Sequence, residues 1–316
     1  MKVSILVPIY GVEKYIEQCA HSLMKQTYDD IEYVFVDDCT PDNSINLLKE
    51  VVAQYPHRAH QVRILTHEHN RGIGAVRLTA LMAATGQCVM HIDSDDYIDE
   101  RCVEVLVKHM ETTGAMMVDG GYAIDRKGTI TGSTPPFKGG KHAYVSHLLC
   151  QNVVYNRIWG RLINRQALLE NGIFPIEGID YGDDFVLAPR MVAALTREWV
   201  DETLYFYRDD NTTSYTNTLS PKYHRSYLRS CAVVIEHFST IKEYGAALDQ
   251  CKLAVLRHAR RFNVKWEDVE HFCPQALAPE RKVARLIARL LHSPRCPYGL
   301  SCFVYRVYRR LFLLSL

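Results

Sequence analysis

Residues 3–38 read VSILVPIYGVEKYIEQCAHSLMKQTYDDIEYVFVDD, and this stretch decides the fold class. It opens with a continuous apolar run at residues 3–8, which is typical of a buried strand. Residues 13–25 follow with apolar side chains at helical spacing, and residues 31–36 form a second apolar run that ends in two aspartates. A strand, a helix and a strand in this order predict an α/β fold with a mostly parallel sheet and crossover helices.

The same alternation continues to about residue 120. Further strands are expected at residues 62–65, 88–92 and 116–119, and further helices at residues 44–55, 75–84 and 101–113. After Gly120, turn residues such as Gly128, Gly132 and the pair Pro135-Pro136 predict loops rather than another regular crossover. Beyond these loops we expect helices at 166–171 and 184–195, a strand at 202–207, and a helical extension that runs from Pro221 to about residue 262 and again over 279–291.

The bulk composition is that of an ordinary globular protein. The 316 residues are 47% hydrophobic and 23% charged, and the net charge of +1 gives no bias towards nucleic acid, which we do not expect as a partner. The charge is unevenly distributed, because residues 281–316 contain eight Lys or Arg and no Asp or Glu, so that the preceding residues carry −7. The sequence therefore describes a mildly acidic body with a basic tail.

The ten cysteines are scattered and include no CxxC pair, which predicts free, mostly buried thiols rather than a disulfide framework or a zinc site. The sequence opens directly into a strand, and no stretch reaches the roughly 18–20 apolar residues that span a bilayer. We therefore expect a cytoplasmic protein.

Clustered carboxylates follow two of the expected strands. Asp37-Asp38 ends the second strand, and Asp93, Asp95 and Asp96 follow the strand at 88–92. Ligands of open α/β sheets bind outside the carboxyl ends of the strands. Since like charges repel, Mg²⁺ or Mn²⁺ shared with a phosphate would stabilise such a cluster. The alternative is that these aspartates only form turns and helix N-caps.

Several segments resemble, in order, a family 2 glycosyltransferase with the GT-A fold, of the bacterial surface-polysaccharide type. The resemblance covers roughly residues 1–215. Its segments are VSILVPIYG (3–11), VDD (36–38), NRGIGAVR (70–77), HIDSDD (91–96), WGRL (159–162), GDD (182–184) and YFYR (205–208).

The resemblance implies a metal-dependent, inverting transfer of a sugar from a nucleotide diphosphate donor, a UDP-sugar, to a glycan or lipid-linked glycan. Residues 1–120 would be the nucleotide-sugar-binding half of a GT-A-like domain, 121–220 the acceptor half, and 221–316 a helical extension. Two other classes stay open. A sugar nucleotidyltransferase would use similar carboxylates but release pyrophosphate, and a binding module would hold the donor without turnover.

On the donor side, the resemblance assigns Pro8 and Tyr10 to the base pocket, Asp38 to reading of the base, and Asp93 to the neighbourhood of the ribose. Arg77 would pair with a phosphate or an aspartate. The competing interpretations are that Tyr10 simply packs and that Arg77 is a solvated helix charge.

On the catalytic side, the resemblance implies Asp95 as a metal ligand and Asp184 as the general base. The family's Glu-Asp pair is here Asp183-Asp184, so Asp183 is the alternative base, and either residue could instead be a helix N-cap. Arg161 occupies the position of a lysine and would neutralise donor phosphate, although an arginine fork is not equivalent to an ammonium. Leu78 replaces the asparagine that usually follows the cleft arginine.

The basic tail, residues 303–316, mixes aromatic, aliphatic and arginine side chains. This composition suits a helix at the surface of an anionic membrane, which would make the protein peripheral on the inner face of the cytoplasmic membrane. The alternative is a helix docked on the protein's own core.

Overall fold

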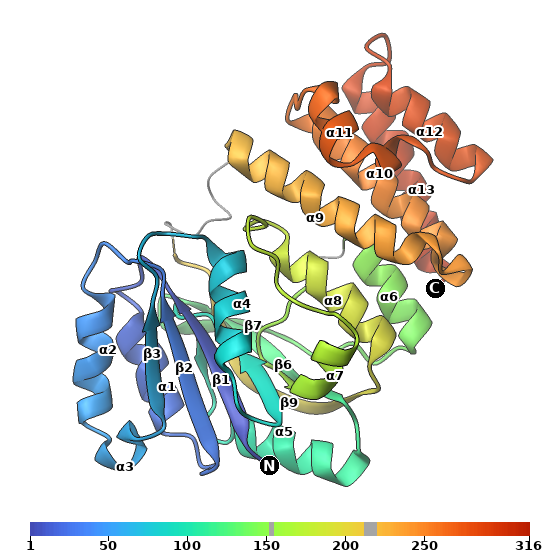
Figure 1. Cartoon of the computed structure of the whole chain (residues 1–316). Coiled ribbons are helices and arrows are strands. Elements are labelled where there is room, and N and C mark those ends of the chain that lie inside the picture. The colour runs from blue at the N-terminus through green and yellow to red at the C-terminus, as the bar shows by residue number, and fades with distance from the viewer. Residues whose placement is uncertain (152–154, 212–219) are drawn as a thin grey trace. The chain divides into compact units, whose positions relative to one another are not determined.

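The computed structural model describes residues 1–151, 155–211 and 220–316 (Figure 1). The chain forms two compact units and passes between them several times. The first unit comprises residues 1–138, 158–178 and 194–217, and the second comprises residues 139–157, 179–193 and 218–316. The three consecutive parts expected from the sequence remain a prediction about function.

The first unit is built on one nine-stranded sheet, so the α/β fold class is confirmed. The strands run in the order β3-β2-β1-β4-β8-β6-β9-β5, and β7 pairs with β6. Their bounds are β1 Val3–Ile9, β2 Ile31–Asp37, β3 Val62–Thr66, β4 Cys88–His91, β5 Tyr97–Ile98, β6 Met117–Arg126, β7 Thr129–Thr134, β8 Arg161–Asn164 and β9 Arg197–Arg208. The first four strands are parallel, whereas β8 is antiparallel to both β4 and β6. The sheet is therefore more mixed than the sequence suggested.

Strand β1 is buried on both sides because helices cover both faces of this sheet. The helices of the first unit are α1 Ile16–Met24, α2 Ser44–Ala53, α3 Pro56–Ala59, α4 Ile73–Ala83, α5 Cys102–Thr113 and α7 Arg165–Glu170. Alternate residues of β1, from Val3 to Ile9, join one hydrophobic core with the buried faces of α1 and α5. Helix α4 packs on β1 and β2 (Figure 1). Burial on both faces explains the continuous apolar run that opens the sequence.

Two strands are longer than the sequence predicted. The run at 116–119 extends to Arg126, and the strand expected at 202–207 begins at Arg197. Loops were expected after Gly120, but Gly120 and Gly121 both lie inside β6. A Cβ atom on Gly120 would come within 3.0 Å of Leu204, and one on Gly121 within 3.0 Å of the carbonyl oxygen of Glu202. These glycines therefore allow β6 and β9 to approach closely.

The second unit is helical. Its helices are α6 Lys141–Leu149, α8 Asp183–Ala194, α9 Pro221–Ser239, α10 Gly245–Arg261, α11 Trp266–Phe272, α12 Lys282–His292 and α13 Tyr298–Leu314. The expected continuous helix to residue 262 is interrupted after Ser239 by a short 3₁₀ turn at Lys242–Tyr244. Across the described residues, no helix combines the length and apolar character that a membrane span requires.

All ten cysteines are free thiols, and all except Cys39 and Cys296 are buried, as the sequence predicted. Burial raises the pKa of several of these thiols; that of Cys88, for example, rises to about 11. They act as small apolar groups.

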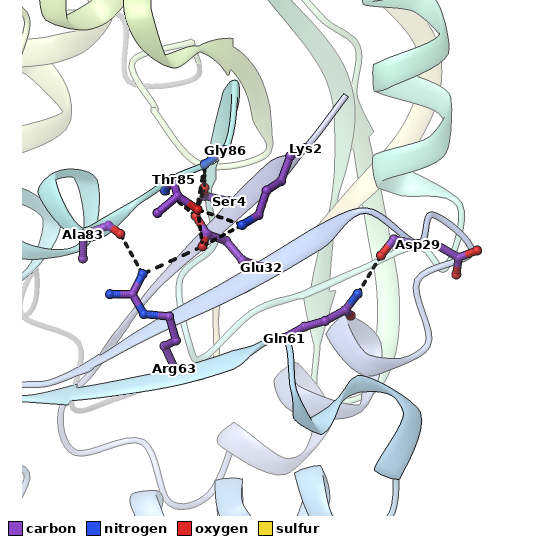
Figure 2. Close-up of polar contacts among 9 residues, drawn as sticks. All are labelled: Lys2, Ser4, Asp29, Glu32, Gln61, Arg63, Ala83, Thr85 and Gly86. Atoms are coloured by element: carbon purple, nitrogen blue, oxygen red, sulfur yellow. Dashed lines mark hydrogen bonds and ion pairs between the residues drawn. The ribbon is translucent and has the colours of Figure 1, made fainter.

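Glu32 is a buried carboxylate in β2, and Figure 2 shows the polar side chains and amides around it. It accepts hydrogen bonds from the Ser4 hydroxyl (2.5 Å) and from the amides of Thr85 (2.5 Å) and Gly86 (3.1 Å). The Lys2 ammonium lies 3.3 Å away. Burial by itself raises the pKa of Glu32, but these hydrogen bonds and Lys2 lower it to about 2. The carboxylate thus links β1 and β2 to the turn that leads into β4.

We predict that Glu32→Gln lowers the free energy of unfolding at pH 7 by roughly 2 kcal/mol, since a depressed folded-state pKa contributes stability. The contribution is complete above about pH 4.5, the unfolded value, and is lost as the pH falls towards about 2. Urea unfolding, monitored by circular dichroism at several pH values, measures the free energy of unfolding. The difference in this free energy between Glu32→Gln and wild type should shrink as the pH falls from about 4.5 towards about 2. Glu111→Gln, an exposed substitution, is the control. Equal stability of Glu32→Gln and wild type would contradict the prediction.

Candidate active site

The carboxyl ends of β1 and β2 are fastened to each other by side-chain hydrogen bonds. The Gly11 amide donates to the Thr40 hydroxyl (2.8 Å), and the Thr40 amide donates to the Asp37 carboxylate (2.8 Å). Gly11 has a φ of +67°, a left-handed conformation that favours glycine. The neighbouring Tyr10 is 51% exposed. Its side chain is therefore not core packing and is available to a ligand.

Asp38 holds the loop that leads into α4. Its carboxylate accepts hydrogen bonds from the amides of Arg71 (2.9 Å) and Gly72 (2.8 Å), and Nδ1 of His67 lies 2.7 Å from it. The side chain is buried. The residue expected to read a base thus also fixes the loop at residues 67–72, a role that the sequence did not reveal.

Arg77 and Asp93 form an ion pair at the end of β4. One terminal nitrogen of the guanidinium lies 2.7 Å from the Asp93 carboxylate, and the Arg77 side chain is 5% exposed. The alternative that Arg77 is a solvated helix charge is therefore wrong. Burial and the nearby Arg77 lower the pKa of His91 to about 3, so that this imidazole is neutral.

Asp95 and Asp96 are held by the end of β9. The Asp96 carboxylate accepts hydrogen bonds from the Tyr205 hydroxyl (2.6 Å) and the Arg208 amide (2.7 Å). The Asn211 amide nitrogen donates to the Asp95 carboxylate (2.8 Å). Burial, and then repulsion by the neighbouring aspartates, raise the pKa of both carboxyl groups. The three carboxyl groups therefore interact strongly enough for a cation to stabilise them.

Aromatic rings line the strands beneath these aspartates. Trp159 stacks on Tyr205 (ring centroids 4.3 Å apart) and Tyr207 (5.6 Å). The Arg208 guanidinium lies over the rings of Tyr15 and Tyr97, at 5.2 and 5.8 Å. These contacts fix Arg208 beside Asp95, whose carbonyl oxygen accepts a hydrogen bond from it (3.0 Å).

The residues around Asp95 fit a divalent cation only in part. Within the described part of the chain, no three His, Cys, Asp or Glu side chains come close enough together to hold a metal ion. Mg²⁺, however, is commonly held by one or two carboxylates together with substrate phosphates and water. Asp95, with oxygen ligands from a diphosphate, fits this pattern.

Arg161 is the residue expected to neutralise donor phosphate. Its side chain is fully buried, and its Nε lies 3.4 Å from the Asp119 carboxylate. Arg197 contacts the same carboxylate at 2.6 Å. This cluster joins β8, β6 and β9 inside the sheet, and the assignment of Arg161 to donor phosphate stays a prediction. Trp159 and Leu162, from the same segment, are also buried.

The acidic pair Asp183-Asp184 lies in the second unit, in the first turn of α8. Gly182, directly before it, has a φ of +83°, and a Cβ atom there would lie 2.4 Å from the Ser230 hydroxyl of α9. The backbone at Gly182 therefore approaches α9 closely. Glycine is required on both grounds.

Helix α9 also holds the two residues before Gly182. The amides of Asp180 and Tyr181 both donate to the Ser226 hydroxyl at 2.8 Å, and the Lys222 ammonium lies 2.9 Å from the Asp180 carboxylate. Lys222, Ser226 and Ser230 are spaced four residues apart and therefore share one face of α9. In the sequence, only this four-residue spacing could have indicated that one face of α9 holds residues 180–182.

The mixed sheet with aspartates at its carboxyl edge has a GT-A-like fold, as the solved structures of S. aureus TarS do. Residues 4–171 match the glycosyl transferase family 2 model, which is over half of the chain, and the protein belongs to this family. The solved structure of S. aureus TarS (1–349) with UDP-GlcNAc aligns with a TM-score of 0.68 at 19% identity, over 100% of this chain and 92% of that one.

The chain is also similar to glycosyltransferases of several bacteria. The uncharacterized glycosyltransferase EpsJ of Bacillus subtilis is 25% identical over 81% of this chain and 75% of its own length. The putative glycosyltransferase EpsH of the same species is 30% identical over 65% of this chain and 60% of its own length. The Escherichia coli chondroitin synthase is 32% identical, but the match covers 40% of this chain and 18% of that protein. The protein is therefore an enzyme of the glycosyltransferase class.

We predict that Ser226→Ala lowers kcat for sugar transfer about tenfold and leaves the donor KM unchanged. The substitution leaves one buried and one partly buried amide without their acceptor, a cost of about 1–3 kcal/mol, and releases the segment before the acidic pair. Steady-state kinetics with varied donor separate the two constants. Ser239→Ala, on the exposed part of the same helix, is the matched control. An unchanged kcat in Ser226→Ala would show that α9 does not position the acidic pair.

Proposed function

We propose that the protein is a metal-dependent, inverting glycosyltransferase that moves a sugar from a UDP-sugar to a hydroxyl of a glycan or lipid-linked glycan. The observation that carries the proposal is the partly buried group of aspartates after β4, where Asp93 pairs with Arg77, and where burial and then repulsion by Asp93 raise the pKa of Asp95. A site of this kind suits a cation and a diphosphate better than a neutral ligand.

The donor side is assigned to the first unit. Tyr10 and Pro8 lie at the exposed end of β1, where a half-exposed aromatic ring can stack on a base. Asp38 keeps the loop at residues 67–72 in place, and its carboxylate has lone pairs left for an N–H of the base. TarS has been solved with UDP-GlcNAc, which favours a uridine donor, whereas the mannosyltransferase PcManGT was solved with GDP-Man and Mn²⁺.

Mg²⁺ or Mn²⁺ held by Asp95 would neutralise the charge that develops on the departing diphosphate. Asp93 would stay near the ribose because its ion pair with Arg77 fixes the carboxylate. The acceptor oxygen forms its bond to the anomeric carbon while the bond from that carbon to the diphosphate oxygen breaks. The electron pair of that bond leaves with the nucleoside diphosphate.

Asp184 is the proposed general base, with Asp183 as the alternative. An acceptor hydroxyl is a poor nucleophile at neutral pH, so a positioned carboxylate must take its proton during transfer. The anchoring of residues 180–182 by α9 supports this role, since a base needs a fixed position. An N-cap needs no such support.

The acceptor class and the location are proposed together. Relatives include the E. coli chondroitin synthase and a poly(ribitol-phosphate) β-glucosyltransferase of Bacillus spizizenii, both of which act on polymers by their names. We place this enzyme in the cytoplasm, at the inner face of the membrane, where lipid-linked glycans present their hydroxyl groups.

The first test concerns the metal. Asp95→Asn should reduce metal-dependent donor hydrolysis by at least about 10²-fold, since the amide no longer supplies a charged ligand. Release of UDP from UDP-sugars, measured with and without Mn²⁺ or Mg²⁺, gives the readout. Asp201→Asn, an exposed change in the same unit, controls for charge. Unchanged turnover with the same metal requirement would remove Asp95 from the site.

The second test concerns the base and separates the enzyme from a binding module. Asp184→Asn should keep donor and metal affinity while sugar transfer falls by at least about 10²-fold, the usual scale of a general base. Asparagine caps a helix comparably, so an N-cap role predicts no loss of transfer. Normal transfer by Asp184→Asn together with inactive Asp183→Asn would move the role to Asp183. Release of pyrophosphate instead of UDP would indicate a nucleotidyltransferase.

A further inference from the structure

Helix α13, which contains most of the basic tail, is docked on its own unit through one face. Ser301, Cys302 and Tyr305 are buried. The Arg309 guanidinium donates hydrogen bonds to the carbonyl oxygen of Cys150 (3.1 and 3.2 Å), and the Arg257 guanidinium lies 5.4 Å from the centre of the Tyr305 ring. The docked-helix interpretation of the tail is therefore correct for this face.

The opposite face of α13 is apolar and exposed. Five large side chains on it are between 42% and 76% exposed, namely Leu300, Phe303, Val307, Leu311 and Leu314. At 3.6 residues per turn these five positions fall within an arc of about 80°. Ordinary surface helices expose single apolar side chains, whereas a continuous stripe marks a binding surface.

Helix α12 repeats this arrangement. It buries Ala284, Ile287 and Leu291, and it exposes Val283 and Leu286 at 55% and 58%. It packs against α13 and α10 (Figure 1). Two successive helices of the same unit therefore leave large apolar side chains uncovered, a stripe of five on α13 and a pair on α12.

Cations accompany both stripes. Five exposed basic residues lie on the two helices: Lys282, Arg285, Arg289, Arg306 and Arg310. No acidic residue occurs anywhere in residues 281–316. A cavity of about 630 Å³ beside the end of α12 is lined in part by Arg289, His292 and Trp266, and no acidic side chain lines it. Residues 281–316 therefore contain no acidic side chain that could neutralise their positive charge.

We propose that α12 and α13 form a docking face for an anionic lipid bilayer, here called the lipid-docking face and made of residues 282–314. The apolar stripes would enter the boundary between head groups and acyl chains while the arginines contact lipid phosphates. The cavity beside Arg289 leaves room for a head group. A second copy of the chain fits less well, because two faces without acidic residues repel each other and interface cores are depleted of charge.

This inference extends the peripheral location proposed above and names the residues responsible. Both helices lie in the plane of the surface rather than across it, since α13 carries three arginines within 17 residues. The lipid-linked acceptor would then be reached at the membrane on which the enzyme rests. Donor hydrolysis in solution does not require the lipid-docking face.

The test is flotation of the full chain with phosphatidylcholine vesicles that contain or lack phosphatidylglycerol. Wild type should float only with the anionic vesicles, and raised salt should weaken binding, since salt screens exposed charges. Phe303→Gln/Leu311→Gln should lower the partition coefficient at least about tenfold, because two inserted apolar groups are lost. Arg285→Gln/Arg306→Gln/Arg310→Gln should lower it on the order of 10²-fold, at about fivefold per charge.

Matched variants in the first unit control for both changes. Met82→Gln/Ile130→Gln removes two apolar side chains of similar exposure, and Lys25→Gln/Lys49→Gln/Lys108→Gln removes three exposed charges. Both controls should float like wild type. Circular dichroism and UDP-sugar hydrolysis without vesicles should be the same in all five proteins, which shows that the surface variants are folded.

Three outcomes would overturn the proposal. The first is that wild type fails to float with anionic vesicles, and the second is that the surface variants float as well as wild type does. The third is that wild type does not bind vesicles and light scattering shows a dimer that the substitutions Phe303→Gln/Leu311→Gln dissociate. The face would then be a protein interface. Flotation of wild type together with no hydrolysis of any UDP-sugar would instead contradict the proposed enzymatic function and leave the lipid-docking face intact.

Discussion

The carboxyl edge of the sheet in the first unit depends on how the aspartates after β4 are held: Asp96 is buried, and Asp93 and Asp95 are partly buried. Asp93, Asp95 and Asp96 follow β4, and burial and mutual repulsion raise the pKa of Asp95 and Asp96. Such a cluster is stable only where other elements supply positive charge or hydrogen-bond donors. Here α4 supplies Arg77 and β9 supplies Tyr205 and the Arg208 amide.

This constraint explains why segments far apart in the sequence meet at one edge of the sheet. Strand β9 begins more than 100 residues after β4, yet its end supplies donors to both Asp95 and Asp96. Trp159 stacks on Tyr205 and Tyr207, and the Tyr205 hydroxyl donates a hydrogen bond to Asp96. The features that neutralise the cluster also leave Asp95 beside Asn211 at the edge where a donor would bind.

Local patterns in the sequence predicted the first half of the fold, because buried parallel strands are apolar runs and amphipathic helices repeat every 3.6 residues. The strand at 31–36 and the helix at 101–113 were predicted within about one residue of their bounds. The burial of Arg161 was not predicted because its partner, Asp119, lies in a strand that only the tertiary fold brings beside β8. The length of β6 was missed because Gly120 and Gly121 normally indicate a strand end.

The anchoring of Asp180–Gly182 by α9 has a consequence for how enzymes of this type can be recombined. The family match ends at residue 171, before both the acidic pair and the helix that supports it. Exchange of everything after residue 220 for the helices of a relative would therefore replace Lys222, Ser226 and Ser230 while keeping the loop that they hold. A chimera that is to keep the conformation of this loop must take the loop and α9 from the same parent, although the two are distant in the chain.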